Sequence, residues 1–243
     1  MKGVEKLVVL AAGKGVRMQP LTLEKPKALV ELNGKPLIEH VLEAFEYAGI
    51  SKAVIVVGYK KEAIIEYLGK KWNSIAIEYA YQNEPKGTAN ALIQAEKYLE
   101  HCKKFATANS DVIIDKTELK RIVNEASKLL ESNEAVIVAR KSKEPWKYGC
   151  LLVEGNRLRE IVEKPERGKE PSNLINAGYY FFTPKIFEFA KKVKPSSRGE
   201  YEITDAINML AAEGKVAYIK TKKRVFDIGT IAELKEAEKI LKV

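Results

Sequence analysis

An apolar run that leads into a basic, glycine-rich loop lies near the start of the chain. Residues 7–12 are all apolar, and Gly13 follows them directly. A short apolar run ended by glycine is typical of a strand buried on both faces of a parallel sheet. Glycines let backbone N–H groups converge on an anion. The loop adds positive charge from Lys14, Arg17, Lys25 and Lys27. This stretch therefore predicts a buried strand that feeds a phosphate-binding loop.

Two common phosphate loops do not match this stretch. The dinucleotide fingerprint needs a third glycine where this chain has Met18, and an acid about twenty residues further on. The P-loop needs a glycine four residues ahead of its Gly-Lys pair and a hydroxyl after it, whereas Gly34-Lys35 is followed by Pro36. An ordinary strand-to-helix turn with surface lysines is the simple alternative.

The order of residues from Leu10 to Thr22, with Lys25-Pro26-Lys27 after it, resembles the signature of the sugar-1-phosphate nucleotidylyltransferases. These enzymes make nucleoside diphosphate sugars, and the similarity runs from about residue 6 to residue 232. One departure is Val16, where the family usually has threonine, so only the backbone N–H is left to contact a phosphate there. The resemblance implies nucleotide-binding roles for Leu10, Ala11, Ala12, Gly13, Lys14 and Gly15.

Length and charge limit the classes of protein. A chain of 243 residues can bury one sizeable core, so we expect a single domain over residues 1–243. Lys and Arg number 42 against 33 acids, and the resulting net charge of +9 favours anionic partners. The basic runs at 191–194 and 220–224 lack interleaved aromatics, which favours a solvated surface and speaks against nucleic acid as a partner.

Cysteine usage and hydropathy predict a soluble, cytoplasmic protein. Cys102 and Cys150 lie far apart, without metal spacing or a disulfide framework, as is typical of a reducing compartment. No stretch approaches the ~20 apolar residues of a membrane span, so no membrane partner is expected. The sequence leaves homo-oligomerisation open.

Helix and strand patterns alternate after the loop. The helix pattern covers residues 36–45, 61–68 and 117–130, and the buried-strand pattern covers 53–57, 75–79, 105–112 and 135–139. Alternation predicts parallel crossovers, and with the resemblance a three-layer α/β/α Rossmann-like nucleotidyltransferase fold with a mostly parallel central sheet. Runs at 148–153 and 158–162 around a Gly-Asn turn predict a hairpin in a small antiparallel sugar-binding layer.

The loop over residues 82–89 is expected at the carboxyl end of a strand, where open α/β sheets bind ligands. Gln82 offers a donor and an acceptor on one amide, which suits the imide edge of uracil or thymine. Gly87 would let a flat base approach the backbone. Plain turn chemistry with Thr88 as a helix cap is the alternative. The resemblance favours nucleotide binding by Gln82, Gly87 and Thr88, since Gln-x-x-Pro-x-Gly-Thr-Ala looks like the family's base-reading loop.

Two aspartates are candidate metal ligands. Asp111 ends a predicted strand and could hold Mg²⁺, which prefers a few carboxylates plus phosphates and water. The family usually has Gly-Asp here, and this chain has Ser110-Asp111. Asp227 lies in an Asp-x-Gly-Thr motif that resembles the family's second metal-binding acid. Turn or helix-start roles are the alternatives for both aspartates.

Gly149, Glu163, Lys164 and Asn176 supply groups that a sugar phosphate needs. Glu163 and Asn176 can bind hydroxyls, Lys164 can bind a phosphate, and Gly149 permits close approach of the backbone. On the residues alone, a Glu-Lys pair is more often an exposed surface pair. The motifs Tyr-Gly, Glu-Lys-Pro and Asn-Ala-Gly, in this order, resemble the family's sugar-phosphate subsite.

The resemblance implies that a nucleoside triphosphate and a sugar 1-phosphate give an NDP-sugar and pyrophosphate. Asp111 and Asp227 would hold Mg²⁺. Arg17 and the glycine loop, helped by Lys27, would hold the departing pyrophosphate, and Lys164 the incoming phosphate. Gln82 and the segment at 198–205 favour UTP or dTTP with glucose 1-phosphate.

The sequence leaves three alternatives to a transferase that uses UTP or dTTP with glucose 1-phosphate. GTP with mannose 1-phosphate is the alternative within the class. A catalytically inactive homologue that binds NDP-sugar is disfavoured, because binding alone would not need both metal acids. Nucleic-acid binding rests only on the net charge. Many relatives carry a carboxyl-terminal left-handed β-helix, and none is expected in these 243 residues.

Overall fold

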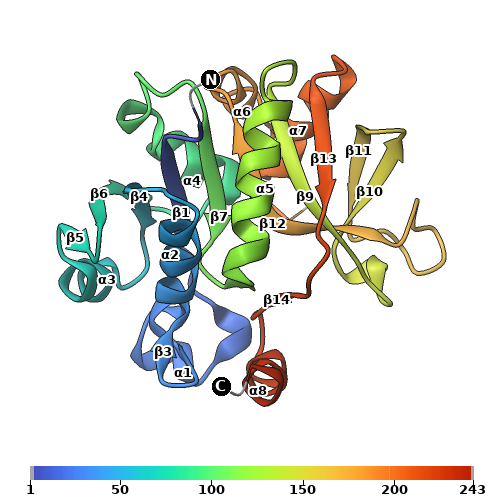
Figure 1. The fold of residues 1–243 in the computed structure, drawn as a ribbon. Coiled ribbons are helices and arrows are strands. Elements are labelled where there is room, and N and C mark those ends of the chain that lie inside the picture. Colours follow the sequence, from blue (N-terminus) through green and yellow to red (C-terminus); the bar gives the residue numbers. More distant parts are fainter. Residues whose placement is uncertain (1–2, 197, 242–243) are drawn as a thin grey trace.

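A single ten-stranded sheet forms the centre of the computed structural model, which describes residues 3–196 and 198–241 (Figure 1). The strand order is β10-β11-β13-β9-β12-β7-β1-β4-β6-β5. These strands are β1 (Lys6–Ala11), β4 (Lys52–Val57), β5 (Lys71–Trp72), β6 (Ile75–Tyr81), β7 (Phe105–Asn109), β9 (Ala135–Lys141), β10 (Gly149–Glu154), β11 (Arg157–Glu163), β12 (Leu174–Phe182) and β13 (Val216–Lys220).

Helices cover both faces of this sheet. The helices of the fold are α1 (Leu21–Glu24), α2 (Leu37–Tyr47), α3 (Lys61–Leu68), α4 (Thr88–Gln94), α5 (Lys116–Leu129), α6 (Ile186–Ala190), α7 (Ile203–Ala212) and α8 (Ile231–Ile240). Of these, α1 and α8 lie below the sheet in Figure 1 and cover neither face. Figure 1 shows α2 and α5 in front of the sheet and α4 and α7 behind it. In the described part of the chain, none of the helices is both long and apolar enough to span a membrane.

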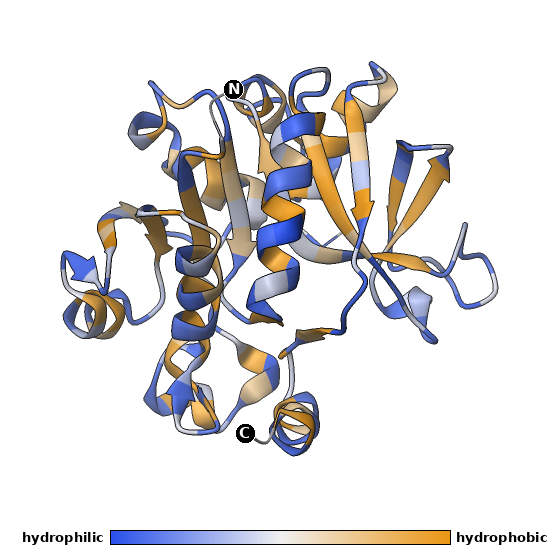
Figure 2. Ribbon diagram, viewed as in Figure 1, coloured by the Kyte–Doolittle hydropathy of each residue, from blue (hydrophilic) through white to orange (hydrophobic). Residues whose placement is uncertain are grey.

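Strand β1 shows why the predicted three-layer fold forms. It lies between β7 and β4, parallel to both. Its residues alternate between two cores: Leu7 and Val9 join the cluster under α2 and α5, while Val8 and Leu10 join the cluster under α4 and α7. Figure 2 shows the strands as mostly hydrophobic ribbons, while α5 is hydrophilic on its outer face. The α/β/α fold predicted from alternation is confirmed.

The antiparallel part of the fold is arranged differently from the prediction. Strand β12 lies between β7 and β9 and is antiparallel to both, so it separates two parallel blocks. The β10–β11 hairpin is present but is not a separate layer. The hairpin continues the same sheet, because one residue pair joins β11 to β13 and another joins β10 to β12. Unpaired backbone N–H and C=O groups at the edge of the sheet are satisfied by such pairing.

Two short strands that the sequence did not predict form a second ladder. The expected strand over 105–112 divides at Ser110-Asp111, so that β8 (Val112–Ile114) leaves the main sheet. It pairs with β14 (Val225–Asp227), which lies just before the last helix. That helix, α8, begins after Thr230, whose side chain is its cap. The ladder β8–β14 therefore joins two segments that lie far apart in sequence.

Glu118 on α5 fixes the connection that leads into β14. Its side chain is 4% exposed. It accepts hydrogen bonds from Arg121 at 2.7 and 3.0 Å, from the backbone N–H of Lys222 at 2.6 Å and from the Thr221 hydroxyl at 3.2 Å. The hydrogen bond from Arg121, which outweighs the effect of burial, lowers the pKa of Glu118 to about 2. The carboxylate thus attaches α5 to the chain just before β14.

We expect the substitution Glu118→Gln to lower the free energy of unfolding by about 2 kcal/mol at pH 7, because a buried charged acceptor is lost. The folded pKa lies below the ordinary 4.5, so this stabilisation is complete above pH 4.5 and is lost as the pH falls towards 2. Denaturant titrations of both proteins at pH 7 and pH 3 measure the difference, which should be smaller at pH 3.

Glu125→Gln is the matched control. Glu125 lies about two turns further along the same helix, pairs with the same Arg121 at 2.5 Å and is 46% exposed. Exposed pairs contribute little, so a change under about 1 kcal/mol is expected. Equal losses in the two variants would show that the buried carboxylate has no special role.

Candidate active site

A cavity of about 470 Å³ lies at the carboxyl end of β1. Residues from several elements line it, and they include every residue that the sequence assigned to nucleotide binding: Leu10, Ala11, Ala12, Gly13, Lys14, Gly15, Gln82, Gly87 and Thr88. Lys27 and Asp111 also line it. The β1 loop, the loop before α4 and the turn after β7 therefore form one cavity, which we call the nucleotide cavity.

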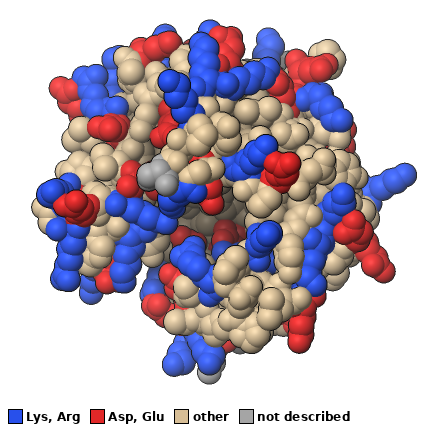
Figure 3. Space-filling view, turned by 180° about the vertical axis from the view of Figure 1, so that it is seen from behind, with Lys and Arg blue, Asp and Glu red and all other residues tan. Residues whose placement is uncertain are grey.

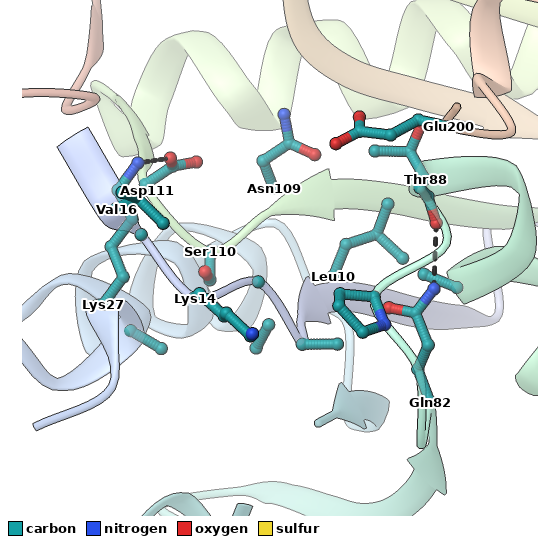
Figure 4. Close-up of a pocket in the computed structure, with 18 residues that line it drawn as sticks. Leu10, Lys14, Val16, Lys27, Gln82, Thr88, Asn109, Ser110, Asp111 and Glu200 are labelled. Atoms are coloured by element: carbon teal, nitrogen blue, oxygen red, sulfur yellow. Dashed lines mark hydrogen bonds and ion pairs between the residues drawn. The ribbon is translucent and has the colours of Figure 1, made fainter. Parts of the chain in front are cut away.

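The glycine loop packs tightly against Lys27. Gly15 has a φ of +62°, and a Cβ atom there would lie 2.9 Å from the Cβ of Lys27. The Thr22 hydroxyl donates to the Gly15 carbonyl at 2.9 Å and holds the turn closed. Lys27 then reaches Asp111 in an ion pair whose side chains are only 14% and 16% exposed. The loop thus places a cation and a carboxylate at one end of the cavity (Figure 4).

Gln82 lies at the opposite end of the nucleotide cavity, beside Thr88 (Figure 4). Its Nε2 group donates to the Gly87 carbonyl at 3.0 Å and to Asn90 Oδ1 at 2.9 Å, and the residue is 6% exposed. Both amide protons are therefore used inside the protein. The expectation that Gln82 offers a donor and an acceptor to a base needs correction, because only the acceptor Oε1 remains.

Gly87 marks the place where a distant segment packs against the loop over residues 82–89, which we call the base loop after the role that the sequence predicts. Its φ is +99°, and a Cβ atom would lie 2.5 Å from the Tyr201 carbonyl oxygen. Tyr201 donates to the Lys86 carbonyl and accepts from Ala89, both at 2.8 Å. The Thr88 hydroxyl accepts from the N–H of Ile203 at 2.9 Å. The segment before α7 therefore fixes the shape of this loop.

A second cavity, of about 220 Å³, adjoins the first. Its lining includes all four residues that the sequence assigned to the sugar phosphate: Gly149, Glu163, Lys164 and Asn176. Thr88 and Asn109 line both cavities, so the two share a wall. We call the second one the sugar cavity, after the role that the sequence predicts.

Two of its residues are held in fixed conformations. Asn176 accepts from the N–H of Gly178 at 3.0 Å and donates to the Tyr180 hydroxyl at 2.6 Å. Lys164 has a φ of +45°, uncommon for a residue with a Cβ atom, and its N–H donates to the Tyr148 carbonyl at 3.1 Å. Backbone strain of this kind persists only where the surroundings impose it, and it clusters at functional sites.

One aspartate lines each cavity. Asp111 belongs to the nucleotide cavity and Asp227 to the sugar cavity. The β8–β14 ladder brings them together, since Asp227 pairs with Val112 and the N–H of Ile228 donates to the Asp111 carbonyl at 3.0 Å. Burial, followed by the Asp111 carboxylate, raises the pKa of Asp227 to about 6. Two carboxylates that repel each other in this way favour a cation between them.

The donor set fits Mg²⁺ with substrate bound. In the residues that the structure describes, no group of three or more His, Cys, Asp or Glu side chains could hold a metal. Asp111 and Asp227 supply two carboxylates, and Mg²⁺ is usually held by one or two carboxylates together with phosphate and water oxygens. An ion at this point would therefore need a phosphorylated substrate to complete its ligands.

Two cations of the phosphate loop lie elsewhere than predicted. Lys25 forms an ion pair with Glu31 at 3.0 Å and is not among the described residues that line either cavity, so its predicted place in the phosphate cradle is wrong. Arg17 lines the sugar cavity beside Asp227 rather than the nucleotide cavity. Its predicted contact with the departing phosphates stays a prediction.

Sequence reasoning missed several lining residues, among them Asn109 and Arg140. Glu200 and Glu202 also line the cavities, and they lie in the segment 198–205 that the resemblance connected with the choice of substrate. Asn109 directly precedes Ser110-Asp111 at the end of a strand, so its position could have indicated the site. Arg140 gave a weaker signal, because it follows the predicted strand over 135–139 as the first of two basic residues, Arg140-Lys141, and runs of charge are usually solvated surface. In Figure 3 the surface is hollowed near its centre, with Lys and Arg atoms around the hollow and acidic atoms in its depth.

Comparisons with known proteins agree with this geometry. The family model described as nucleotidyl transferase matches residues 6–242. The UTP–glucose-1-phosphate uridylyltransferase AglF of Haloferax volcanii is 38% identical, over 96% of this chain and 95% of that protein. The bifunctional protein GlmU of Methanocaldococcus jannaschii is 37% identical over 96% of this chain, which spans only 53% of that protein.

Solved structures give the same result. A UDP-glucose pyrophosphorylase in complex with UDP-glucose superposes with a TM-score of 0.88 at 26% identity, and 98% of each chain is covered. A putative glucose-1-phosphate thymidylyltransferase from Bacillus anthracis gives 0.87 at 26% identity, covering 98% of this chain and 95% of that one. Motifs, fold and cavities thus point the same way, and the chain belongs to the nucleotidyl transferase family.

Proposed function

We propose that the protein transfers a nucleotidyl group from a nucleoside triphosphate to a sugar 1-phosphate. The observation that carries the proposal is the pair of adjoining cavities with one aspartate in each. UTP and glucose 1-phosphate are the favoured substrates, with dTTP as the close second. The similarity to a uridylyltransferase over 96% of the chain supports this choice.

The proposed reaction is an in-line displacement at the α-phosphorus. A phosphate oxygen of the sugar 1-phosphate forms a new bond to that phosphorus, the bond to the β-phosphate bridging oxygen breaks, and pyrophosphate leaves with the electron pair. Positioning and charge neutralisation carry such reactions, and no side-chain nucleophile is needed. Lys27 and the glycine loop would hold the triphosphate, and Lys164 the sugar phosphate. Mg²⁺ on Asp111 and Asp227 would neutralise charge on both phosphates.

The hydrogen bonds of Gln82 narrow the choice of base. With both amide protons donated to Gly87 and Asn90, only the acceptor Oε1 is left to face a base, so it needs an N–H donor. Uracil, thymine and guanine offer a ring N–H on the Watson–Crick edge, whereas the ring nitrogen of cytosine and adenine there is an acceptor and only their exocyclic amino group donates. We therefore retain GTP with mannose 1-phosphate as the second candidate.

A matrix of substrates tests the proposal. UTP, dTTP, GTP, CTP and ATP are each incubated with glucose 1-phosphate and with mannose 1-phosphate, and release of pyrophosphate is measured. We expect turnover with UTP or dTTP and glucose 1-phosphate, and none with CTP or ATP. Reaction with GTP alone would overturn the base assignment. Absence of pyrophosphate in every pairing would overturn the proposed function and favour an NDP-sugar-binding homologue.

We expect Asp111→Asn and Asp227→Asn each to lower kcat/KM by at least about 100-fold, because each removes a charge from the point where the phosphates meet. Both replacements keep the size of the side chain, so thermal unfolding should change little. Glu125→Gln, at an exposed site on α5, is the control and should retain wild-type turnover. Retention of activity in either aspartate variant would exclude that carboxylate from metal binding.

The raised pKa of Asp227, about 6, predicts that metal binding depends on pH. A proton competes with the metal below the pKa, so affinity should fall about tenfold per pH unit below pH 6 and level off above it. Substrate phosphate monoesters also titrate near pH 6. The measurement is therefore titration with Mn²⁺ in place of Mg²⁺ from pH 5 to 8 at saturating UDP-glucose, whose phosphate diesters complete the ligands and stay fully charged over this range. Equal affinity across this range would contradict the prediction, and Asp227→Asn should bind weakly without the pH dependence.

A further inference from the structure

Arg140 lies at a junction that the sequence did not indicate. It follows a run of buried strand residues in β9 and pairs with Ile175 of β12. It lines the sugar cavity, and also a larger cavity of about 1030 Å³ that adjoins it and is rich in lysine and arginine. It is not part of the nucleotide cavity. Arg140 therefore lies on the sugar side of the site, away from the nucleotide cavity.

The guanidinium is held in place without an acceptor. It stacks over the Tyr148 ring at 4.9 Å from the ring centre, and Tyr148 lines the same cavity. The Nε–H group is buried and has no hydrogen-bond partner among the described residues. Buried donors are nearly always satisfied, so an unpaired one needs an explanation. The aromatic ring stabilises the charge but accepts no hydrogen bond in the guanidinium plane.

Two neighbouring cations, Lys147 and Arg198, differ from Arg140 in this respect. Lys147, in the same cavity, forms an ion pair with Glu144 at 2.7 Å. Arg198, whose partner Glu202 lines the cavity, is paired with that residue at 2.8 Å. Within the described residues, no ion pair is formed by Arg140. Asp227, the proposed metal-binding carboxylate, lines both the sugar cavity and the larger cavity together with Arg140.

We propose that Arg140 contacts the sugar 1-phosphate and, together with Lys164, binds its phosphate group. The inference rests on the proposed function. A planar guanidinium with adjacent N–H groups matches the oxygens of a phosphate, and stacking on Tyr148 fixes its plane in advance. A phosphate in the sugar cavity would satisfy the buried Nε–H. Arg140 thus acts as a residue that determines affinity for the sugar phosphate and not for the triphosphate.

Three variants test the proposal through separate KM values for the two substrates. Arg140→Gln removes the charge, Arg140→Lys keeps it without the planar group, and Lys143→Gln is the control. Lys143 is exposed and lines the larger cavity but not the sugar cavity. Loss of a charged hydrogen bond predicts that Arg140→Gln raises KM for glucose 1-phosphate about 10- to 100-fold, with KM for the triphosphate within about twofold.

Arg140→Lys should raise the same KM by a smaller factor, about three- to tenfold, and Lys143→Gln should leave both KM values unchanged. If Arg140→Gln fails to fold, the lysine variant carries the test. Unchanged KM for glucose 1-phosphate, or an equal rise for both substrates, would overturn the proposal. A loss confined to a sugar with its own carboxylate, tested with glucuronic acid 1-phosphate, would also overturn it, since Arg140 would then bind that carboxylate.

Equilibrium binding separates this inference from the proposed function. Titration calorimetry with glucose 1-phosphate, and with inorganic phosphate as a second probe, needs no turnover. Weaker binding by Arg140→Gln in a protein that releases no pyrophosphate would support the phosphate contact and overturn the reaction. Equal binding by wild type and variant, or no binding by the wild type, would overturn the contact even if the protein is an active transferase.

Discussion

The rest of the site depends on two carboxylates, those of Asp111 and Asp227, which the fold holds near each other. The β8–β14 ladder places Asp227 against the residue that follows Asp111, and burial together with the facing charge raises the pKa of Asp227 to about 6. Such an arrangement is unfavourable without positive charge. Lys27 supplies it from the nucleotide cavity and Arg140 from the sugar cavity. Both cavities thus supply positive charge to the same pair of carboxylates.

Structural connections also link the two cavities. The segment 201–203 bonds to the base loop through Lys86, Thr88 and Ala89, while Ile203 itself lines the sugar cavity. The base loop therefore cannot move without disturbing the start of α7. Glu118 fixes the other side, because it holds the connection into β14 and so the position of Asp227. The base loop of the nucleotide cavity is therefore held by the segment before α7, and Asp227 of the sugar cavity is held in place through α5.

Much of the fold and site could be predicted from local patterns. The apolar run of β1, the glycine loop and the helices α2, α3 and α5 agree with the prediction, because hydrophobic periodicity and glycine act over a few residues. All nucleotide and sugar residues assigned from the motifs line the expected cavities. The errors concern the hydrogen-bond and ion-pair partners of single side chains. Lys25 pairs with Glu31, and Gln82 donates both amide protons inside the protein. Hydrophobic periodicity and turn residues do not show which polar groups bond to one another.

By itself the sequence determined the alternating α/β order, the glycine-rich basic loop after the first strand and the positions of the two candidate metal-binding acids. Only the tertiary structure decided that β12 divides the sheet, that β8 and β14 pair, and that Arg140 meets Tyr148 beside Asp227. The physical reason is the distance along the chain over which each kind of interaction acts. Periodicity and turn chemistry act between neighbours in the chain, whereas strand register, burial of charge and the sharing of a cavity wall depend on residues that only folding brings together.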